Sequence, residues 1–331
     1  MRRLLSAAAA VVLVLASAPA QGYLHLTAPT SAGSRALRWS ASPVRWFASE
    51  RGVPGVSPSE FQAAVSRAFG AWEAVPTASA ASAFGGFTSG SPLEDDGLSV
   101  FGFEDAPDLE RVLGATSFVV DVTTGELVEA DVFFNTRFAW STAAAGDPAA
   151  FDLQSVATHE IGHVLGLGHS ALGETEVLPT GGRRVLASGA VMFPISFGRG
   201  NVADRILQPD DIAGISDLYP DGDFRQRTGG VQGQVRLGGR PVIGAHVAAF
   251  DPRRGTLVGG FALGADGAFA INGLEPGPYV LRVEPLDDAE VESFFSGSGL
   301  ERGFQPVVYD RLVVAPRGGA SPPASIDVRP R

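Results

Sequence analysis

The feature that most constrains this chain is the stretch of residues 157–170, which reads ATHEIGHVLGLGHS. His159 and His163 are four residues apart, so on a helix they lie one above the other on the same face, about 6 Å apart along the axis. Two imidazoles at that separation can bind one metal ion. Glu160 lies one step around the helix, where it can reach a water on that metal without ligating it.

After this helix the chain is predicted to turn back, so that a third histidine joins the first two. Gly166 is the expected helix stop, because glycine tolerates the left-handed conformation that such a turn requires. The turn can bring His169 to the metal as a third ligand, which leaves a fourth position open for water, as in catalytic zinc sites. Three of the five histidines lie in this stretch, which weakens the alternative that they are core and loop residues.

Composition and charge narrow the class of protein. The chain has 331 residues, 45% hydrophobic and 18% charged, which is typical of a globular protein and is long enough for two domains. The formal net charge of −11 argues against nucleic acids and anionic membranes as partners. The chain has no cysteine, so disulfides cannot stabilise the fold and no cysteine can carry a lipid anchor.

The first 20 residues are predicted to be a secretory signal peptide. Two arginines precede an apolar run, and Ala18-Pro19-Ala20 matches an A-x-A cleavage site. The apolar run is too short for a membrane span, and an N-terminal anchor is the alternative interpretation. Residues 21–36, rich in Ser, Ala, Thr and Pro, are expected to form an extended leader. We therefore expect a secreted, extracellular protein without a membrane span.

Residues 37–222 combine one helical pattern with several strand patterns before the histidine motif. Ser57-Pro58-Ser59-Glu60 is a capping box with proline at the first helical position, and the apolar residues that follow recur every three or four positions, as in a core-facing helix. Asp152 is expected to cap the helix that carries the motif, from about residue 153 to 165. Strands are predicted at residues 44–47, 99–103, 115–122 and 127–134, with Thr124-Gly125 turning a hairpin between the last two.

The pattern changes after a polar linker at residues 223–229. Residues 230–331 show short alternating strand patterns and no helical one. Strands are predicted at residues 231–236, 245–250, 256–263, 268–271 and 279–283, and near 307–314 and 326–328. This part is therefore expected to be an all-β domain. His246 stands alone on a strand and is expected to be a satisfied or surface histidine rather than a ligand.

The metal motif and several segments around it resemble the matrixin branch of the metzincin zinc peptidases. Ser170 follows the third histidine as in matrixins, and residues 190–194 (AVMFP) resemble the matrixin Met-turn. Residues 207–220 (LQPDDIAGISDLYP) resemble the C-terminal helix of that family, and residues 129–135 (EADVFFN) resemble the strand along the active-site cleft. The similarity covers residues 37–220 and implies an α+β metzincin catalytic domain with a twisted mixed sheet and three helices.

The resemblance also implies roles for individual residues. Met192 would form the floor under the zinc without ligating it, which as a packing role is the same as that of a core methionine. Phe193 and Pro194 would begin the wall of the pocket for the residue after the scissile bond. Asp211 would hydrogen-bond the Met-turn backbone, and Asp210 could receive a buried N-terminal ammonium. The alternative is that both acids complement the helix dipole.

Two further features bear on the resemblance. Residues 171–188 form a longer segment than in compact matrixins, which is a departure from the family pattern beside the part of the cleft that follows the scissile bond. In the C-terminal part, the glycine, aspartate and tyrosine positions between residues 244 and 279 resemble a transthyretin-like, carboxypeptidase-regulatory type of β-sandwich. We find no catalytic constellation there, so this domain is expected to add stability, anchoring or substrate positioning.

The predicted function is a secreted zinc-dependent endopeptidase. One catalytic zinc is held by His159, His163 and His169, and Glu160 is the general base and then the general acid in the hydrolysis of peptide bonds. The substrates are proteins or peptides, and the protein is expected to be a monomer. Calcium could bind carboxylates near Glu94-Asp95-Asp96, although solvated acids explain them too. The alternatives are a catalytically silent zinc-binding adhesion or matrix protein, and a zinc amidase acting on cell-wall peptides.

Overall fold

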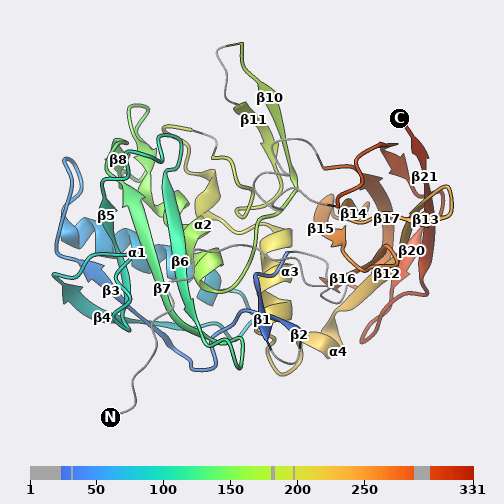
Figure 1. Ribbon diagram of the computed structural model, residues 1–331, viewed down its shortest axis with the longest axis horizontal. Helices are drawn as coiled ribbons and strands as arrows, with labels where there is room; N and C mark the ends of the chain where they lie inside the picture. Colours follow the sequence, from blue (N-terminus) through green and yellow to red (C-terminus); the bar gives the residue numbers. More distant parts are fainter. Residues whose placement is uncertain (1–23, 31–32, 180–182, 197, 287–298) are drawn as a thin grey trace.

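The computed structural model describes residues 24–30, 33–179, 183–196, 198–286 and 299–331. Figure 1 shows a mixed part with a sheet and helices beside a second part built from strands, with one helix, α3, lying between them. The signal peptide predicted for residues 1–20 lies outside the described residues. Among the helices that are described, none is both long enough and apolar enough to cross a membrane.

The mixed part is built on a five-stranded sheet. Its strands are β3 (Val44–Ser49), β4 (Ser82–Thr88), β5 (Ser99–Glu104), β6 (Gly114–Val120) and β7 (Leu127–Asn135). Their order is β4-β3-β5-β7-β6, and every pair is parallel except the β6–β7 hairpin. The four predicted strands and the hairpin are confirmed. Two short strands, β8 (Trp140–Ser141) and β9 (Phe151–Asp152), pair in parallel before the motif helix.

Two helices, α1 (Pro58–Glu73) and α2 (Leu153–Val164), pack on this sheet through one hydrophobic cluster. The predicted capping box is present, because Ser57 and Glu60 exchange side-chain to backbone hydrogen bonds. The apolar stripe of α1 is buried, as expected from its spacing. Trp72 of α1 donates its indole N–H to the carbonyl of Thr158 at 2.9 Å, which fixes α2, the motif helix, against α1.

The third helix, α3 (Pro209–Leu218), follows a single 3-10 turn, η1 (Ala203–Arg205), and lies on the border with the strand-rich part. A one-turn helix, α4 (Phe224–Arg227), lies within the segment that we predicted to be a polar linker. Phe224 is buried, and its ring lies against Gly273 of the strand-rich part. This segment therefore packs on the fold in addition to connecting its two parts.

The strand-rich part contains two five-stranded sheets that share one hydrophobic cluster. The first has β16 (Ala268–Leu274) paired to β12 (Gly229–Leu237) and the order β13 (Arg240–Pro241), β12, β21 (Ala324–Pro330), β18 (Phe304–Gln305). The second has β20 (Val313–Ala315) paired to β17 (Gly277–Glu284) and the order β15 (Thr256–Ala262), β14 (Ala245–Asp251), β17, β19 (Val307–Val308). The predicted strands thus correspond to strands of the structure.

Two hairpins were not predicted from the sequence. In place of an extended leader, β1 (Thr27–Thr30) and β2 (Gly33–Ala36) form an antiparallel pair, because the apolar side chains of Leu24 and Leu26 are buried and tie this segment to the fold. The long segment after the third histidine forms β10 (Gly173–Val177) and β11 (Arg183–Ser188), which project from the molecule at the top of Figure 1.

Candidate metal centre

The three motif histidines meet at the end of α2. His159 and His163 lie on α2, and the chain turns back at Gly166, whose φ is +96°. A Cβ at Gly166 would lie 2.2 Å from the carbonyl oxygen of Leu37, so both the conformation and the close approach require glycine. The turn brings His169 to the other two rings. One ring nitrogen from each histidine lies within 4.8 Å of the others.

Backbone carbonyls fix the orientation of two of the rings. His159 Nδ1 lies 2.8 Å from the carbonyl oxygen of Val191, and His163 Nδ1 lies 2.8 Å from that of Leu167. Because a carbonyl only accepts, each Nδ1 carries the hydrogen and each Nε2 presents its lone pair. Carbonyl oxygens are common partners of the second nitrogen of metal-binding histidines.

The separation of two of these nitrogens and the chemistry of the rings fit a tetrahedral zinc ion. The Nε2 atoms of His163 and His169 are 3.1 Å apart, and two nitrogens about 2.05 Å from a tetrahedral zinc are about 3.3 Å apart. Burial lowers the pKa of His159. Burial and the nearby rings lower the pKa of His163 well below its ordinary value. The neutral imidazole, which is the form that binds metal, is therefore favoured.

Glu160 is buried beside this cluster. The hydroxyl of Thr116, on β6, donates to Glu160 Oε2 at 2.7 Å. Burial raises the pKa of Glu160 to about 7, and the hydrogen bond from Thr116 opposes that rise. Thr116 was not found by reasoning from sequence, because its partner is 44 residues away and only the β6–α2 packing brings the two together.

Met192 lies in the turn of residues 190–194, which we call the Met192 turn. The side chain is buried, and a Cβ placed on Gly162 of α2 would lie 2.2 Å from its sulfur, so the methionine packs directly against the metal helix. Asp211 accepts hydrogen bonds from the backbone N–H groups of Val191 and Met192 at 2.8 and 3.1 Å. These bonds hold the carbonyl of Val191 in place to accept from His159.

The other predicted residues near this turn occupy distinct places. Phe193 is buried, and its ring closely approaches Gly173 at the start of the β10–β11 hairpin, while Pro194 is partly exposed. Asp210 neither receives an ammonium from the described residues nor acts only on the helix dipole. It accepts from the hydroxyl of Ser170 at 2.5 Å and from the N–H of Gly259 at 2.7 Å.

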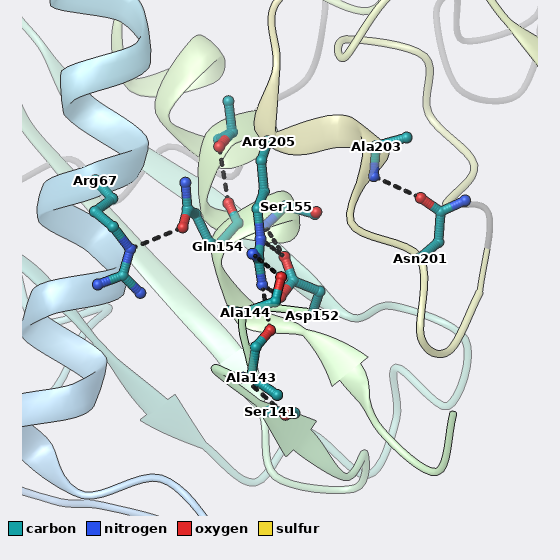
Figure 2. Close-up of polar contacts among 11 residues, drawn as sticks. Arg67, Ser141, Ala143, Ala144, Asp152, Gln154, Ser155, Asn201, Ala203 and Arg205 are labelled. Carbon is teal, nitrogen blue, oxygen red and sulfur yellow. Dashed lines mark hydrogen bonds and ion pairs between the residues drawn. The ribbon is translucent and has the colours of Figure 1, made fainter. Parts of the chain in front are cut away.

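Hydrogen bonds from Arg205 hold the start of α2, the motif helix (Figure 2). Asp152 caps α2 by accepting from Ser155 N at 2.7 Å, as predicted for this residue. Arg205 donates to both carboxylate oxygens of Asp152 and to the carbonyls of Ala143 and Ala144. One guanidinium therefore joins the helix start, the loop before it and the segment that follows the Met192 turn. Nothing in the sequence around Arg205 indicated this role.

The acidic loop considered for calcium is closed by hydrogen bonds from its own backbone. Asp131 accepts from Leu93 N and Val100 N, both at 2.7 Å, and Glu129 accepts from Gly97 N at 2.5 Å. Burial, opposed by the Gly97 bond and helped by nearby acids, raises the pKa of Glu129 to about 7. Calcium at this loop stays a prediction.

Comparison with known proteins places this centre in a family. A family model described as Matrixin matches residues 38–220, more than half of the chain. Metalloendoproteinase 4-MMP of Arabidopsis thaliana is 27% identical over 208 residues, which are 58% of this chain and 53% of that protein. Metalloendoproteinase 2-MMP of the same plant is 32% identical over 172 residues, 48% of this chain and 37% of that protein.

A soybean relative agrees with these matches. Metalloendoproteinase 1 of Glycine max is 30% identical over 174 residues, 48% of this chain and 45% of that protein. The chain thus spans about half the length of these relatives, or less. Because the matched family region contains all three histidines and Glu160, the geometry and the similarity concern the same part of the molecule.

Proposed function

The chain belongs to the matrixin family of zinc metalloendopeptidases, and on that premise we propose that it is a secreted endopeptidase that cleaves proteins or peptides. The observation that carries the proposal is the convergence of three imidazoles beside a buried carboxylate. His159, His163 and His169 would hold the zinc. Glu160 is the one carboxylate that the motif places next to them without making it a ligand.

The chain's own groups divide the work of hydrolysis. A zinc ion held by the three rings supplies Lewis acidity, which lowers the pKa of water toward about 7. Glu160 accepts the proton of the attacking water and later donates it to the leaving amine. Thr116 fixes one oxygen of Glu160 by its hydroxyl hydrogen bond. Val191 and Leu167 orient two of the rings through their carbonyls, so little reorganisation is needed when substrate binds.

The remaining parts of the chain have proposed roles around this centre. Met192 forms the apolar floor, Asp211 holds the Met192 turn, and Phe193 with Pro194 begins the pocket for the residue after the scissile bond. Residues 1–20 direct secretion, and residues 37–222 form the peptidase domain. Residues 223–229 connect it to a transthyretin-like β-sandwich at residues 230–331. Support for the sandwich comes from its two sheets around one hydrophobic cluster.

The test is a zinc-dependent cleavage assay on casein, gelatin and a peptide library. Glu160→Gln should keep stoichiometric zinc by metal analysis and lose turnover, because it keeps the side chain's volume and removes the base. Glu110→Gln, which changes an exposed glutamate, is the matched control and should cleave normally. Removal of zinc by a chelator should stop cleavage, and added zinc should restore it.

Two other outcomes would replace the proposal. A zinc-loaded wild-type chain that cleaves no protein or peptide would indicate a silent zinc-binding adhesion or matrix protein. Activity on peptidoglycan with none on proteins would indicate a cell-wall amidase, which shares the same metal chemistry.

A further inference from the structure

We propose that the C-terminal strand-rich part completes the catalytic site. Asp210 is the positioning residue, because it joins strand β15 to the loop that carries the third zinc ligand, His169. The inference rests on the proposed function and deepens it, because it gives the C-terminal part a role in catalysis. It is carried by hydrogen bonds across the border between the two parts of the fold.

Asp210 is the central group of this connection. It lies in the first turn of α3 and is 3% exposed. One carboxyl oxygen accepts from the N–H of Gly259 on β15 at 2.7 Å, and the other accepts from the hydroxyl of Ser170 at 2.5 Å. Each of its two oxygens thus has a donor, and the two donors come from the two different parts of the fold.

Ser170 connects Asp210 to the metal centre. It directly follows His169, its N–H donates to the carbonyl of Met192 at 2.8 Å, and its hydroxyl also accepts from Leu172 N at 3.2 Å. The backbone beside the third ligand is therefore held on one side by the Met192 turn and on the other by Asp210. Movement of Asp210 would be transmitted to His169 through a single residue.

Gly259 presents its N–H because β15 is an edge strand of its sheet. That edge faces α3, so Asp210 supplies the acceptor that a neighbouring strand would otherwise supply. Gly259 lies close to two side chains. A Cβ at this position would lie 2.9 Å from His246 Nε2 and 3.1 Å from Leu172 Cγ. A larger residue here therefore requires the side chains of His246 and Leu172 to move, or β15 to move away from the segment that follows Ser170.

Apolar packing seals the same contact. Leu24, Ala171, Phe261 and Leu286 form one buried cluster, which joins the start of the described chain, the metal loop and the strand-rich part. Phe261 lies two residues beyond Gly259 on β15. Water is therefore kept from the Asp210 carboxyl, which makes its two donors its principal stabilisation.

The experiment uses the full-length, zinc-loaded protein and compares four variants. Gly259→Ala crowds His246 and Leu172 where β15 meets Asp210, and Asp210→Ala removes the connection. Asp210→Asn preserves it, because the amide oxygen can accept from Gly259 and the amide N–H can donate to Ser170. The matched control is Asn272→Ala, which removes another hydrogen bond between the two parts, from β16 to Asp217 near the far end of α3 at 3.5 Å.

Three quantities are measured at a temperature where circular dichroism shows each variant folded. They are the rate of zinc release to a chromogenic chelator, kcat, and KM on a peptide substrate. Gly259→Ala and Asp210→Ala should release zinc about tenfold faster and lose about tenfold in kcat, as changes to groups that orient zinc ligands typically do. KM should change little, and Asp210→Asn and Asn272→Ala should stay within about twofold of wild type.

The outcomes separate the possible errors. Wild-type rates of zinc release and turnover in folded Gly259→Ala and Asp210→Ala would overturn the inference. So would equal acceleration of zinc release in Asn272→Ala, since the effect would then be general destabilisation. If Asp210→Ala does not fold, Gly259→Ala and Asp210→Asn still decide. If the wild type cleaves nothing, the proposed function fails, whereas the zinc-release comparison still tests the connection.

Discussion

Gly162, in the middle of α2, provides a test of how the core is packed behind the three motif histidines. It lies between His159 and His163 on the sequence, and its Cα faces Met192 and Trp72. A Cβ at this position would lie 2.2 Å from Met192 Sδ, 3.1 Å from Met192 Cε and 2.9 Å from Trp72 Cζ2. We predict that Gly162→Ala destabilises the protein and loosens the metal site, although alanine is the better helix former.

The expected magnitude follows from two opposing effects. Alanine in a helix interior is favoured over glycine by about 1 kcal/mol. Overpacking a filled core costs about 1–3 kcal/mol, and the three short distances place this site near the upper end. Methionine is flexible, so part of the strain is relieved, but the backbone of Met192 is fixed by Asp211. We therefore expect a net loss of about 1–2 kcal/mol in the free energy of unfolding.

The assay is urea unfolding followed by tryptophan fluorescence, because all four tryptophans lie between residues 39 and 140 and so report on the mixed part. The matched control is Gly70→Ala on α1, where a Cβ would meet nothing within 4 Å. This control should stabilise by about 0.5–1 kcal/mol. If Gly162→Ala stabilises to the same degree as Gly70→Ala, the packing argument is refuted.

Two further predictions concern charged groups away from the histidines. Arg205→Ala should lower the free energy of unfolding by about 2–3 kcal/mol, because it leaves the carboxylate of Asp152, whose side chain is 1% exposed, without its charged partner. The control is Arg137→Ala, which breaks an ion pair whose side chains are 53% and 62% exposed. In the same urea titration it should lower the free energy of unfolding by under about 1 kcal/mol. Folding raises the pKa of Glu129 from 4.5 to about 7. At a pH between these two pKa values, the folded chain keeps a proton that the unfolded chain has released. The free energy of unfolding therefore falls as pH rises through this range. Glu129→Gln should therefore show a smaller fall in urea midpoint between pH 5 and pH 8 than wild type, and equal pH dependence would contradict this assignment.

Local patterns made much of the fold predictable. The capping box at Ser57 and the apolar stripe of α1 are set by residues within a few positions of one another, and the structure places both as expected. The β6–β7 hairpin is likewise a neighbour contact. The β10–β11 hairpin escaped prediction because its segment has no clear alternation.

The Arg205–Asp152 ion pair and the Asp210–Gly259 hydrogen bond could not be predicted from local patterns. Arg205 and Asp152 are 53 residues apart, and Asp210 and Gly259 are 49 residues apart. Each partner is an ordinary residue in its own segment. The packing of α2 against η1 and of α3 against β15 determines which acid meets which donor.

The sequence by itself determined that the three motif histidines converge, because their geometry is local: a four-residue helical spacing, and a glycine turn three residues after the second histidine. The same local rules determined the N-terminal caps of α1 and α2 and four of the five strands of the sheet in the mixed part. Tertiary structure alone decided which distant groups hold His159, Glu160 and Asp210. The carbonyl of Val191, the hydroxyl of Thr116 and the N–H of Gly259 come from distant segments, and a long-range hydrogen bond depends on how sheets and helices pack, which no short stretch of sequence specifies.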